Sequence, residues 1–222
     1  MNVRRAIEDY RSWGLLRFLQ LRVMKLLRRQ LTLCGIYARP HSRDVVLPPL
    51  PDNRHVRVAT TDELVEAGKD PVYGLEPEFI DFSMGKGDLC AGLFEDDRLL
   101  AYYWRATSVT PHLDGIWVEP GARYCYSYKA FTHPAYRQQG LQEHVARFTD
   151  AIMLQRGFTH SIGFVETHNF PSIKASLRRG SRKVGYAGYV RVFGRILPFR
   201  SRGAKRHGFR FFIPSGEAAA SG

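Results

Sequence analysis

The sequence predicts an α/β (α+β) fold in which a mixed, mostly antiparallel sheet is flanked by helices and preceded by a basic amphipathic helix. Three observations predict it. Residues 88–107 and 124–129 alternate between polar and apolar side chains, as strands do. Apolar residues recur at helical spacing over 140–156, and a short apolar run follows at 161–165. Because the chain has 222 residues, 44% of them hydrophobic, it can bury one full core of this kind.

The first predicted element is the basic helix. Apolar residues recur at helical spacing from Leu15 to Leu31, and five Arg or Lys residues lie between them. No charge-free run approaches the roughly 20 apolar residues of a membrane span. We therefore expect the helix either to lie on an anionic membrane surface or to dock on its own domain. We assign residues 1–39 to a basic amphipathic helical segment and residues 40–51, which contain four prolines, to a linker.

The folded domain is assigned to residues 52–214. It is expected to begin with a helix near Thr61, since two acidic residues follow and suit a first helical turn. Asp88–Glu95 and Arg98–Thr107 then alternate around two aspartates, which indicates a β-hairpin. The small residues at 215–222 predict a disordered tail.

A strand-turn-helix-strand unit follows the hairpin. Three tyrosines alternate with other residues over 124–128 and place aromatic rings on one face of a strand. A turn at 132–142 leads into the amphipathic helix, and the helix leads into the short apolar strand. Further strands are expected at 184–193 and 206–213.

The turn at 132–142 has the composition of a phosphate-binding loop. Gly140 leaves little side-chain bulk, so successive backbone N–H groups and the start of the helix can converge on an anion. Arg137 and Gly140 also match the pattern Arg/Gln-x-x-Gly-x-Gly/Ala. On these residues the turn resembles the acyl-CoA pyrophosphate loop of the GNAT (GCN5-related N-acetyltransferase) superfamily. Gln142 replaces the small third residue of the pattern.

A second stretch supports the resemblance. Asn169 to Gly180 has the spacing of the family's next element, in which an Asn opens a short helix that closes on a Gly, and Pro171 fits the first turn. Many relatives have a Tyr at the position of Ser176, where it is proposed to reprotonate the departing thiolate. The resemblance covers about residues 88–195 and implies a GNAT-like fold.

The resemblance also implies an acyl-CoA-dependent N-acyltransferase, in which a small-molecule amine attacks the thioester of acetyl-CoA or another acyl-CoA directly, with no metal. Backbone groups near Phe131 and Thr132, where the family's strand bulges and splays, would pair with the pantetheine arm. Arg137 would contact phosphate or form a surface salt bridge. The cofactor-binding residues implied in this way are Phe131, Thr132, Arg137, Gln138, Gln139, Gly140, Leu141, Gln142 and Asn169.

Four residues are the leading candidates for proton transfer. Glu119 and Glu166 are the carboxylates nearest in sequence to the strands that would border the cleft, and either could accept a proton directly or through water. Tyr126 could donate to the leaving sulfur, whereas Ser176 could do so only through a relay. The alternatives are a solvated strand end for the carboxylates and a place in the core for Tyr126.

Charge is distributed unevenly along the chain. The net charge of +12 divides into +8 for residues 1–43, −7 for residues 44–166 and +11 for residues 167–222. Basic ends of this kind indicate an anionic partner, namely the phosphates of CoA, an anionic membrane surface or an acidic acyl carrier protein. Nucleic acid is not expected, because no recognised DNA- or RNA-binding motif accompanies the charge.

Two alternatives to an acyl-CoA-dependent enzyme remain open. An acyl carrier protein could supply long acyl chains, since its acidic surface would complement the basic residues from Lys174 to Lys183. A non-catalytic, GNAT-like binder of anionic lipid would account for the missing tyrosine. The three cysteines have neither disulfide nor metal-ligand spacing. We therefore expect a cytoplasmic protein, peripheral on the inner membrane face if the basic helix binds lipid.

Overall fold

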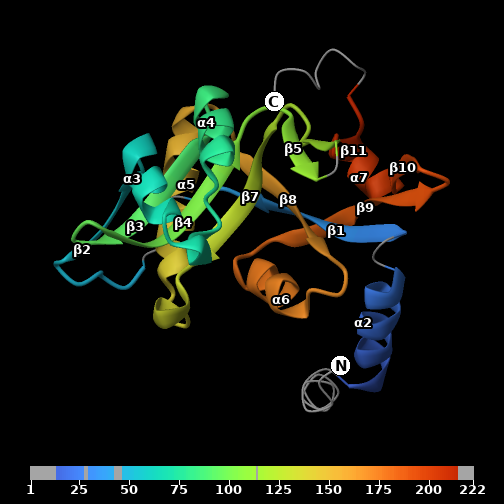
Figure 1. Ribbon diagram of the computed structural model, residues 1–222, viewed down its shortest axis with the longest axis horizontal. Coiled ribbons are helices and arrows are strands. Elements are labelled where there is room, and N and C mark those ends of the chain that lie inside the picture. Colours follow the sequence, from blue (N-terminus) through green and yellow to red (C-terminus); the bar gives the residue numbers. More distant parts are fainter. Residues whose placement is uncertain (1–13, 28–29, 43–46, 114, 215–222) are drawn as a thin grey trace.

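The computed structural model describes residues 14–27, 30–42, 47–113 and 115–214. The predicted tail at 215–222 and the first thirteen residues of the predicted basic segment lie outside this part of the chain. Within it, eight strands form one large sheet and three short strands form a second. Helices cover both faces of the large sheet (Figure 1).

The large sheet is mixed and mostly antiparallel. Its strands are β1 Leu31–Pro40, β2 Arg54–Val58, β3 Leu89–Glu95, β4 Arg98–Ala106, β7 Tyr124–Thr132, β8 His160–Glu166, β9 Arg182–Val192 and β10 Arg195–Arg200. They lie side by side in the order β10-β9-β1-β8-β7-β4-β3-β2, and among these described pairs only β7 and β8 are parallel. The predicted α/β fold with a mostly antiparallel sheet is confirmed.

A second, smaller sheet packs against the aromatic face of the first. Its strands are β5 Thr110–Leu113, β6 Ile116–Glu119 and β11 Arg210–Phe212. Phe211 lies edge-on to Phe164 of β8 and Tyr189 of β9, with ring centroids 5.1 and 5.6 Å apart. The strand that the sequence predicts at 206–213 is shorter in the structure. It has only three residues, and the short helix Arg202–Arg206 precedes it.

Helices pack on both sides of the large sheet. They are α2 Leu15–Leu27, α3 Thr61–Gly68, α4 Pro77–Gly85, α5 Leu141–Gln155, α6 Phe170–Arg178 and α7 Arg202–Arg206, with 3-10 helices η1 Pro71–Tyr73 and η2 Pro134–Tyr136. Leu141 and Val145 of α5 pack on residues of β3 and β4. On the opposite face, Leu64 of α3 and Ile80 of α4 belong to the same cluster as Trp104. The sheet is thus the middle of three layers.

The N-terminal segment differs from its prediction. Helix α2 ends at Leu27, and the residues that follow form β1, which pairs with β8 and β9 inside the sheet. The prediction of a helical segment to residue 39 is wrong for this strand, and the fold includes residues well before the predicted boundary at 52. The strand is buried continuously from Cys34 to Arg39, and strands buried on both faces lack the alternation by which strands are recognised.

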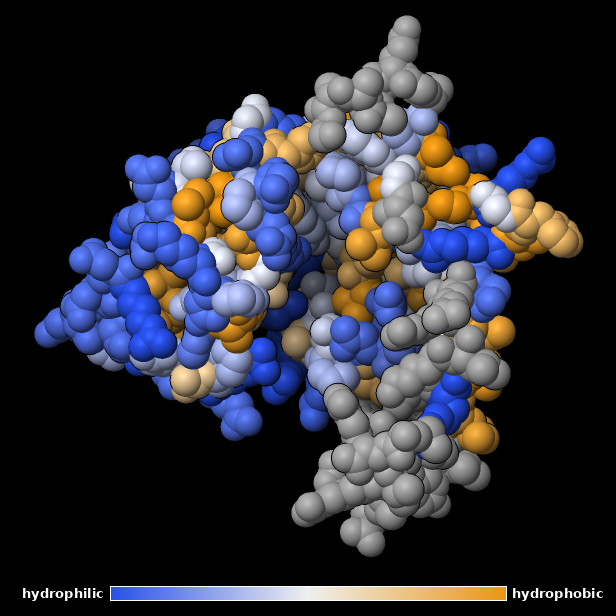
Figure 2. Space-filling model, viewed as in Figure 1, coloured by the Kyte–Doolittle hydropathy of each residue, from blue (hydrophilic) through white to orange (hydrophobic). Residues whose placement is uncertain are grey.

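Helix α2 itself lies within the predicted basic segment. Met24 is only 8% exposed, so one side of the helix docks on the domain. The other side carries exposed apolar side chains at helical spacing: Leu16, Leu19, Val23 and Leu27. Figure 2 shows hydrophobic surface along this side of the molecule, at the right of the view. In the described ranges, no helix is long and apolar enough to span a membrane.

Candidate active site

Strands β7 and β8 separate after a short parallel pairing. Tyr124–Tyr126 pairs with His160–Ile162, and the register stops there. Gly163 lies at the point of separation, where a Cβ would stand 2.9 Å from the carbonyl oxygen of Ser127. Beyond it the facing edges of the two strands are not paired with each other. Their N–H and C=O groups can therefore bind an extended molecule placed between them.

Strand β7 also bends beside this gap. Relative to β4 it has one additional residue between Tyr128 and Ala130, so Lys129 is the extra residue of a β-bulge. Its φ of 38° lies in the left-handed region, which non-glycine residues rarely adopt. A bulge bends the strand and increases its local twist. The bulge was expected near Phe131 and Thr132, and the structure places it two residues before Phe131.

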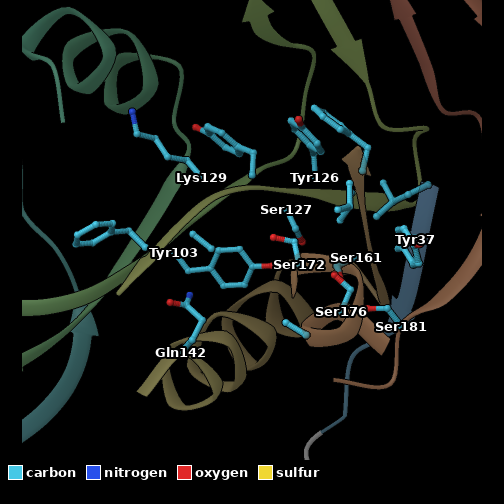
Figure 3. Close-up of a pocket in the computed structure, with 18 of the residues that line it drawn as sticks. Tyr37, Tyr103, Tyr126, Ser127, Lys129, Gln142, Ser161, Ser172, Ser176 and Ser181 are labelled. Carbon is cyan, nitrogen blue, oxygen red and sulfur yellow. The ribbon is translucent and has the colours of Figure 1, made fainter. Parts of the chain in front are cut away.

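The gap opens into a cleft of about 1120 Å³ that is lined from both faces of the sheet. On the α5 and α6 side, Tyr103, Gln142 and Ser176 contribute to its wall (Figure 3). On the α4 side, Phe79 and Tyr128 contribute to it. Two molecules that enter from opposite faces of the sheet can therefore meet between β7 and β8.

The turn between β7 and α5 presents backbone amides. Gln138 and Gly140 have positive φ values of 68° and 73°, and Gly140 is the N-cap of α5 with no side-chain hydrogen bond. A Cβ at Gly140 would meet no atom within 4 Å, so the space beside it is open. The first N–H groups of a helix have no partner within it and form the positive end of its dipole. The turn therefore has the geometry of an anion site.

Gln142, the residue that departs from the family pattern, ties the turn together. Its Nε2 donates to the carbonyl oxygen of Tyr102 at 3.2 Å, and its Oε1 accepts from Thr132 Oγ1 at 3.1 Å. The same Thr132 accepts through its carbonyl oxygen from Nε of Arg137 at 3.3 Å. Thr132, Arg137 and Gln142 all line the cleft. The structure thus explains why a long side chain stands at position 142, because its two hydrogen bonds fasten α5 to β4 and β7.

Of the other predicted cofactor-binding residues, one lines the cleft, two lie at the surface of the turn and one has its side chain in the core. Phe131 lines the cleft. Gln138 is exposed, and Gln139 accepts through Oε1 from Nη1 of Arg54 at 2.8 Å. Leu141 is 3% exposed, and its side chain belongs to the core under α5. Only its backbone amide, at the start of the helix, can serve an anion.

Helix α6 begins beside the same cleft. Asn169 Oδ1 accepts from the backbone N–H of Ser172 at 3.3 Å, so Asn169 caps the helix, and it also lines the cleft. Ser176 is 8% exposed and reaches the cleft from the next turns of α6. The structure therefore brings the position of the missing tyrosine to the cleft wall.

No protein-family model matches this sequence, and no curated protein matches it. Among solved structures, a GCN5-related N-acetyltransferase from Sphaerobacter thermophilus aligns with a TM-score of 0.51 and 10% identity, over 80% of this chain and 56% of its own. The chain has the GNAT fold. A Drosophila protein aligns with a TM-score of 0.51 and 16% identity, over 78% of this chain and 57% of its own.

A GNAT-family acetyltransferase from Novosphingobium aromaticivorans aligns with a TM-score of 0.49 and 18% identity, over 69% of this chain and 60% of its own. This chain thus spans less than two thirds of the length of these three structures. At such identities the likeness is one of fold.

The cleft of this GNAT fold contains one of the two predicted bases. Glu166 ends β8 and lines the cleft, with its Oε2 3.0 Å from Nε2 of His168. Glu119 ends β6, where it is ion-paired with Arg210 of β11, and it is not among the residues that line the cleft. The expectation that Glu119 borders the cleft is wrong, because its strand belongs to the second sheet.

The tyrosine face of β7 lies on the α4 side of the GNAT fold. Tyr126 is 4% exposed, lines the cleft and stacks on Tyr128 with ring centroids 5.4 Å apart. Burial raises the pKa of Tyr126, so its hydroxyl holds its proton firmly. Tyr128 donates to Asp88 Oδ2 at 2.5 Å, a contact that the sequence did not predict. Burial also raises the pKa of Asp88, which makes that carboxylate a better proton acceptor than an ordinary aspartate.

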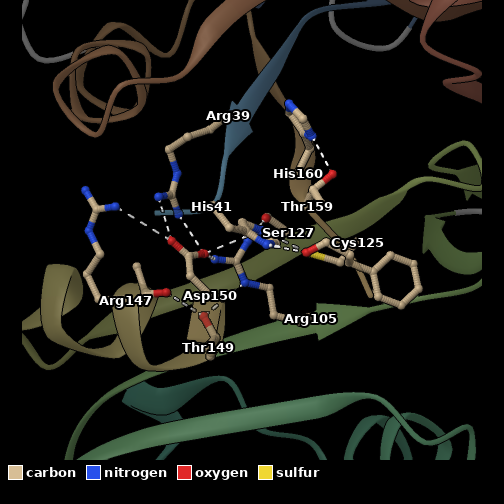
Figure 4. A network of polar contacts seen from close by, with 12 residues as sticks. Arg39, His41, Arg105, Cys125, Ser127, Arg147, Thr149, Asp150, Thr159 and His160 are labelled. Atoms are coloured by element: carbon tan, nitrogen blue, oxygen red, sulfur yellow. Dashed lines mark hydrogen bonds and ion pairs between the residues drawn. The ribbon is translucent and has the colours of Figure 1, made fainter. Parts of the chain in front are cut away.

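A buried charge network lies under the cleft on the α5 side (Figure 4). The side chain of Asp150 is fully buried, and its oxygens lie 2.7 Å from Nη1 of Arg39 and 2.8 Å from Nη2 of Arg105. Arg105 also donates to Thr149 at 3.1 Å and to Ser127, which lines the cleft. A third guanidinium group, that of Arg147, lies 3.9 Å from Asp150, so three positive groups surround one carboxylate and this floor of the cleft is electropositive.

Tyr103 lies between this network and the cleft. Its ring centroid is 4.3 Å from the guanidinium carbon of Arg105, and its hydroxyl is directed into the cleft (Figure 3). Burial acts to raise the pKa of Tyr103, but the charges of Arg105 and Arg179 outweigh it and lower the pKa below its ordinary value. Sequence patterns did not select this residue. A tyrosine with a lowered pKa in a substrate cleft is a candidate acid.

In the part of the chain that the structure describes, the cleft has no cluster of metal-ligating side chains, and no cysteine lines it. Across the described residues, no three His, Cys, Asp or Glu side chains are grouped to hold a metal ion. Cys34, Cys90 and Cys125 are buried thiols, and burial raises the pKa of each. Thiols of this kind stay protonated and unreactive.

Proposed function

We propose that this protein is an N-acyltransferase that moves the acyl group of acetyl-CoA, or of another acyl-CoA, to a small-molecule amine by direct attack. One observation carries the proposal: the cleft between β7 and β8 joins an anion-binding turn on one side of the sheet to an aromatic pocket on the other. A donor with phosphates at one end and a thioester at the other fits that path.

The donor is held mainly by backbone groups. The pantetheine arm lies along the edge of β7 beyond Tyr126, where it extends the sheet as an added strand would. The pyrophosphate lies on the first turn of α5 beside Gly140, and Arg137 supplies a positive charge. The thioester then lies near the bulge at Lys129, between the two halves of the cleft.

The amine enters from the α4 side, past Phe79 and Tyr128. Its attack on the thioester carbonyl gives a tetrahedral oxyanion, which an N–H of β7 stabilises, and collapse releases the CoA thiolate. Glu166 takes the proton of the amine through water. Tyr103 returns a proton to the thiolate, the role for which Ser176 is poorly suited.

Calorimetric titration with acetyl-CoA tests the proposal. Gly140→Glu places a carboxylate at the anion site and is expected to abolish binding. Gly157→Glu is a matched control at the other end of α5, because Gly157 also has a positive φ, of 88°, and open space for a Cβ. Failure of the wild-type protein to bind acetyl-CoA or a longer acyl-CoA would overturn the proposal, as would equal binding by the two variants.

An acyl carrier protein is a second candidate donor. Lys174 and Arg178 are exposed on α6, and the segment from Thr167 to Gly216 contains no Asp or Glu. That surface would attract an acidic carrier. Turnover measured with the same acyl group on CoA and on a carrier protein decides between the donors. A carrier donor is supported only if its kcat/KM exceeds that of acyl-CoA and falls with added salt.

The exposed apolar side of α2 suits a peripheral location on an anionic membrane surface at the cytoplasmic face. Val23 is 51% exposed in the middle of this side. We expect Val23→Glu to lower co-sedimentation with phosphatidylglycerol vesicles several-fold. Leu113→Glu, at an exposed apolar residue on β5, is the control and should bind vesicles like the wild-type protein. An equal loss of vesicle binding in both variants would contradict a role for α2 in membrane binding.

A further inference from the structure

A second hollow of about 1290 Å³ lies outside the transfer cleft, between α2, α6 and the strands β1 and β9. Figure 1 shows α2 standing beside α6 at this side of the sheet. Its wall is mainly apolar and includes Met24, Leu33, Phe170, Ile173 and Leu177. We call this hollow the α2 groove. An aliphatic chain is the kind of ligand that such a wall would shield from water.

The α2 groove also has a basic rim. Lys174, Arg178 and Lys183 are among its lining residues, and none of the residues that line it in the described ranges is acidic. Lys183 donates to the hydroxyl of Tyr186 at 2.6 Å, which keeps its ammonium group beside the groove. A chain that ends in a negative group would complement both the wall and the rim.

One polar group on the groove wall lacks a partner. The side-chain oxygen of Thr167 is buried and has no hydrogen-bond partner among the described residues. The carbonyl oxygen of the same residue accepts from Nε2 of Gln20 at 3.1 Å, which fastens α2 over this part of the wall. The hydrogen bond from Gln20 therefore holds α2 at the edge of the groove, whereas the enclosed hydroxyl of Thr167 is not itself open to a ligand.

We propose that the α2 groove binds an anionic amphiphile, with its aliphatic chain on the apolar wall and its carboxylate or phosphate on Lys174, Arg178 and Lys183. This inference does not depend on acyl transfer. Tyr37 lines both the groove and the transfer cleft, so a bound chain lies one side chain away from the cleft. The ligand would thus be held beside the transfer site without occupying it.

Titration of the full-length protein with cis-parinarate, a fluorescent fatty carboxylate, tests the proposal below the concentration at which the probe aggregates. We expect saturable binding at one site. Oleate and oleoyl lysophosphatidate should both displace the probe, and their relative potency distinguishes a free carboxylate from a lipid phosphate as the preferred head. Oleyl alcohol, which lacks a charge, should compete about tenfold more weakly.

Variants separate the wall from the rim. Ile173→Trp fills the groove and should abolish probe binding, and the double variant Lys174→Glu, Arg178→Glu should weaken it about tenfold or more. Arg195→Glu, on β10 away from the groove, is the control and should not change it. Absence of saturable binding, equal competition by oleyl alcohol, or unchanged binding by Ile173→Trp would each overturn the proposal. Titration with acetyl-CoA reports the transfer cleft separately, so failure of one site does not imply failure of the other.

Discussion

The hydroxyl of Tyr103 stands where an electropositive floor meets the cleft. Arg105 and Arg179 stabilise its phenolate, and Arg105 does so while it is also ion-paired with Asp150. Tyr126, on the other face of the sheet, has no such neighbours, and burial raises its pKa instead. The surroundings thus lower the pKa of one tyrosine of the cleft and raise the pKa of the other.

We expect Tyr103→Phe to lower kcat about 100-fold, because the departing thiolate loses its proton donor. In the wild-type protein the acid form of Tyr103 is lost as pH rises through its lowered pKa, so kcat for the proposed reaction should fall on the alkaline side. Phe cannot titrate, and the variant should lack this fall. Tyr126→Phe is the control and should retain it. An unchanged alkaline limb in Tyr103→Phe would exclude the assigned role.

The buried side chain of His41 leads to a second prediction, which concerns how the free energy of unfolding depends on pH. Burial lowers the pKa of His41 to about 4, and Arg105 acts in the same direction, although the nearby Asp150 opposes them. Between about pH 6.5 and pH 4 the unfolded chain therefore binds a proton that the folded chain does not. The stability due to this residue is complete above pH 6.5 and is lost as pH falls, by up to about 3 kcal/mol.

Urea denaturation at pH 7 and pH 4.5 measures this effect. We expect His41→Gln to show a smaller decrease in the free energy of unfolding between the two pH values than the wild-type protein. His55→Gln, at an exposed histidine whose ring stacks on Phe94, is the control. Equal pH dependence in wild type and His41→Gln would show that His41 is not the group responsible.

Single residues were the hardest features to predict from the sequence. The turn glycine Gly140 and the helix-capping Asn169 were found because local spacing marks them. Asp88 and Tyr103 were missed, because their roles depend on partners distant in the chain. Arg105 did leave a local signal, since it interrupts an otherwise apolar stretch of its strand. A charge at a core position should have prompted a search for a buried partner.

At the level of elements, β1 decides where the folded unit begins. The strand lies between β8 and β9 and supplies hydrogen bonds to both. We expect a chain shortened to residues 28–222 to keep a cooperative thermal transition by circular dichroism. A chain shortened to residues 52–222, the predicted domain, should lose it, because the sheet would lack an interior strand. A cooperative transition in the shorter chain would contradict the assigned place of β1.

Local patterns predicted the elements whose partners are close in sequence. The hairpin of β3 and β4, the unit formed by β7, α5 and β8, and helix α6 all appear near their expected bounds. Strand β1 and the small second sheet did not follow from such patterns. Their stability comes from pairing across more than a hundred residues or from aromatic packing between sheets, neither of which alters local periodicity.

For the whole molecule, the fold class and the general position of the cleft could be predicted from the sequence. The sequence did not predict that residues from both faces of the sheet line the cleft. The cleft requires α4 on one face and α5 with α6 on the other, and no local pattern assigns helices to faces. The uneven charge is reflected in the structure as well. The basic α6 and β9 lie beside α2, so the basic C-terminal part and the N-terminal helix meet at the α2 groove.

The short seam between β7 and β8 has a mechanical consequence. Four strands lie on each side of it, and within the large sheet, as far as the structure describes it, only the pairing of Tyr124–Tyr126 with His160–Ile162 joins the two halves through backbone hydrogen bonds. Arg39 belongs to one half, while Asp150 and Arg105 belong to the other, so the buried ion pair between Arg39 and Asp150 crosses the seam. The large sheet therefore consists of two four-stranded halves that are joined along one short edge. The angle between the halves, and hence the width offered to a substrate, depends on this buried carboxylate together with the apolar cluster that spans both halves.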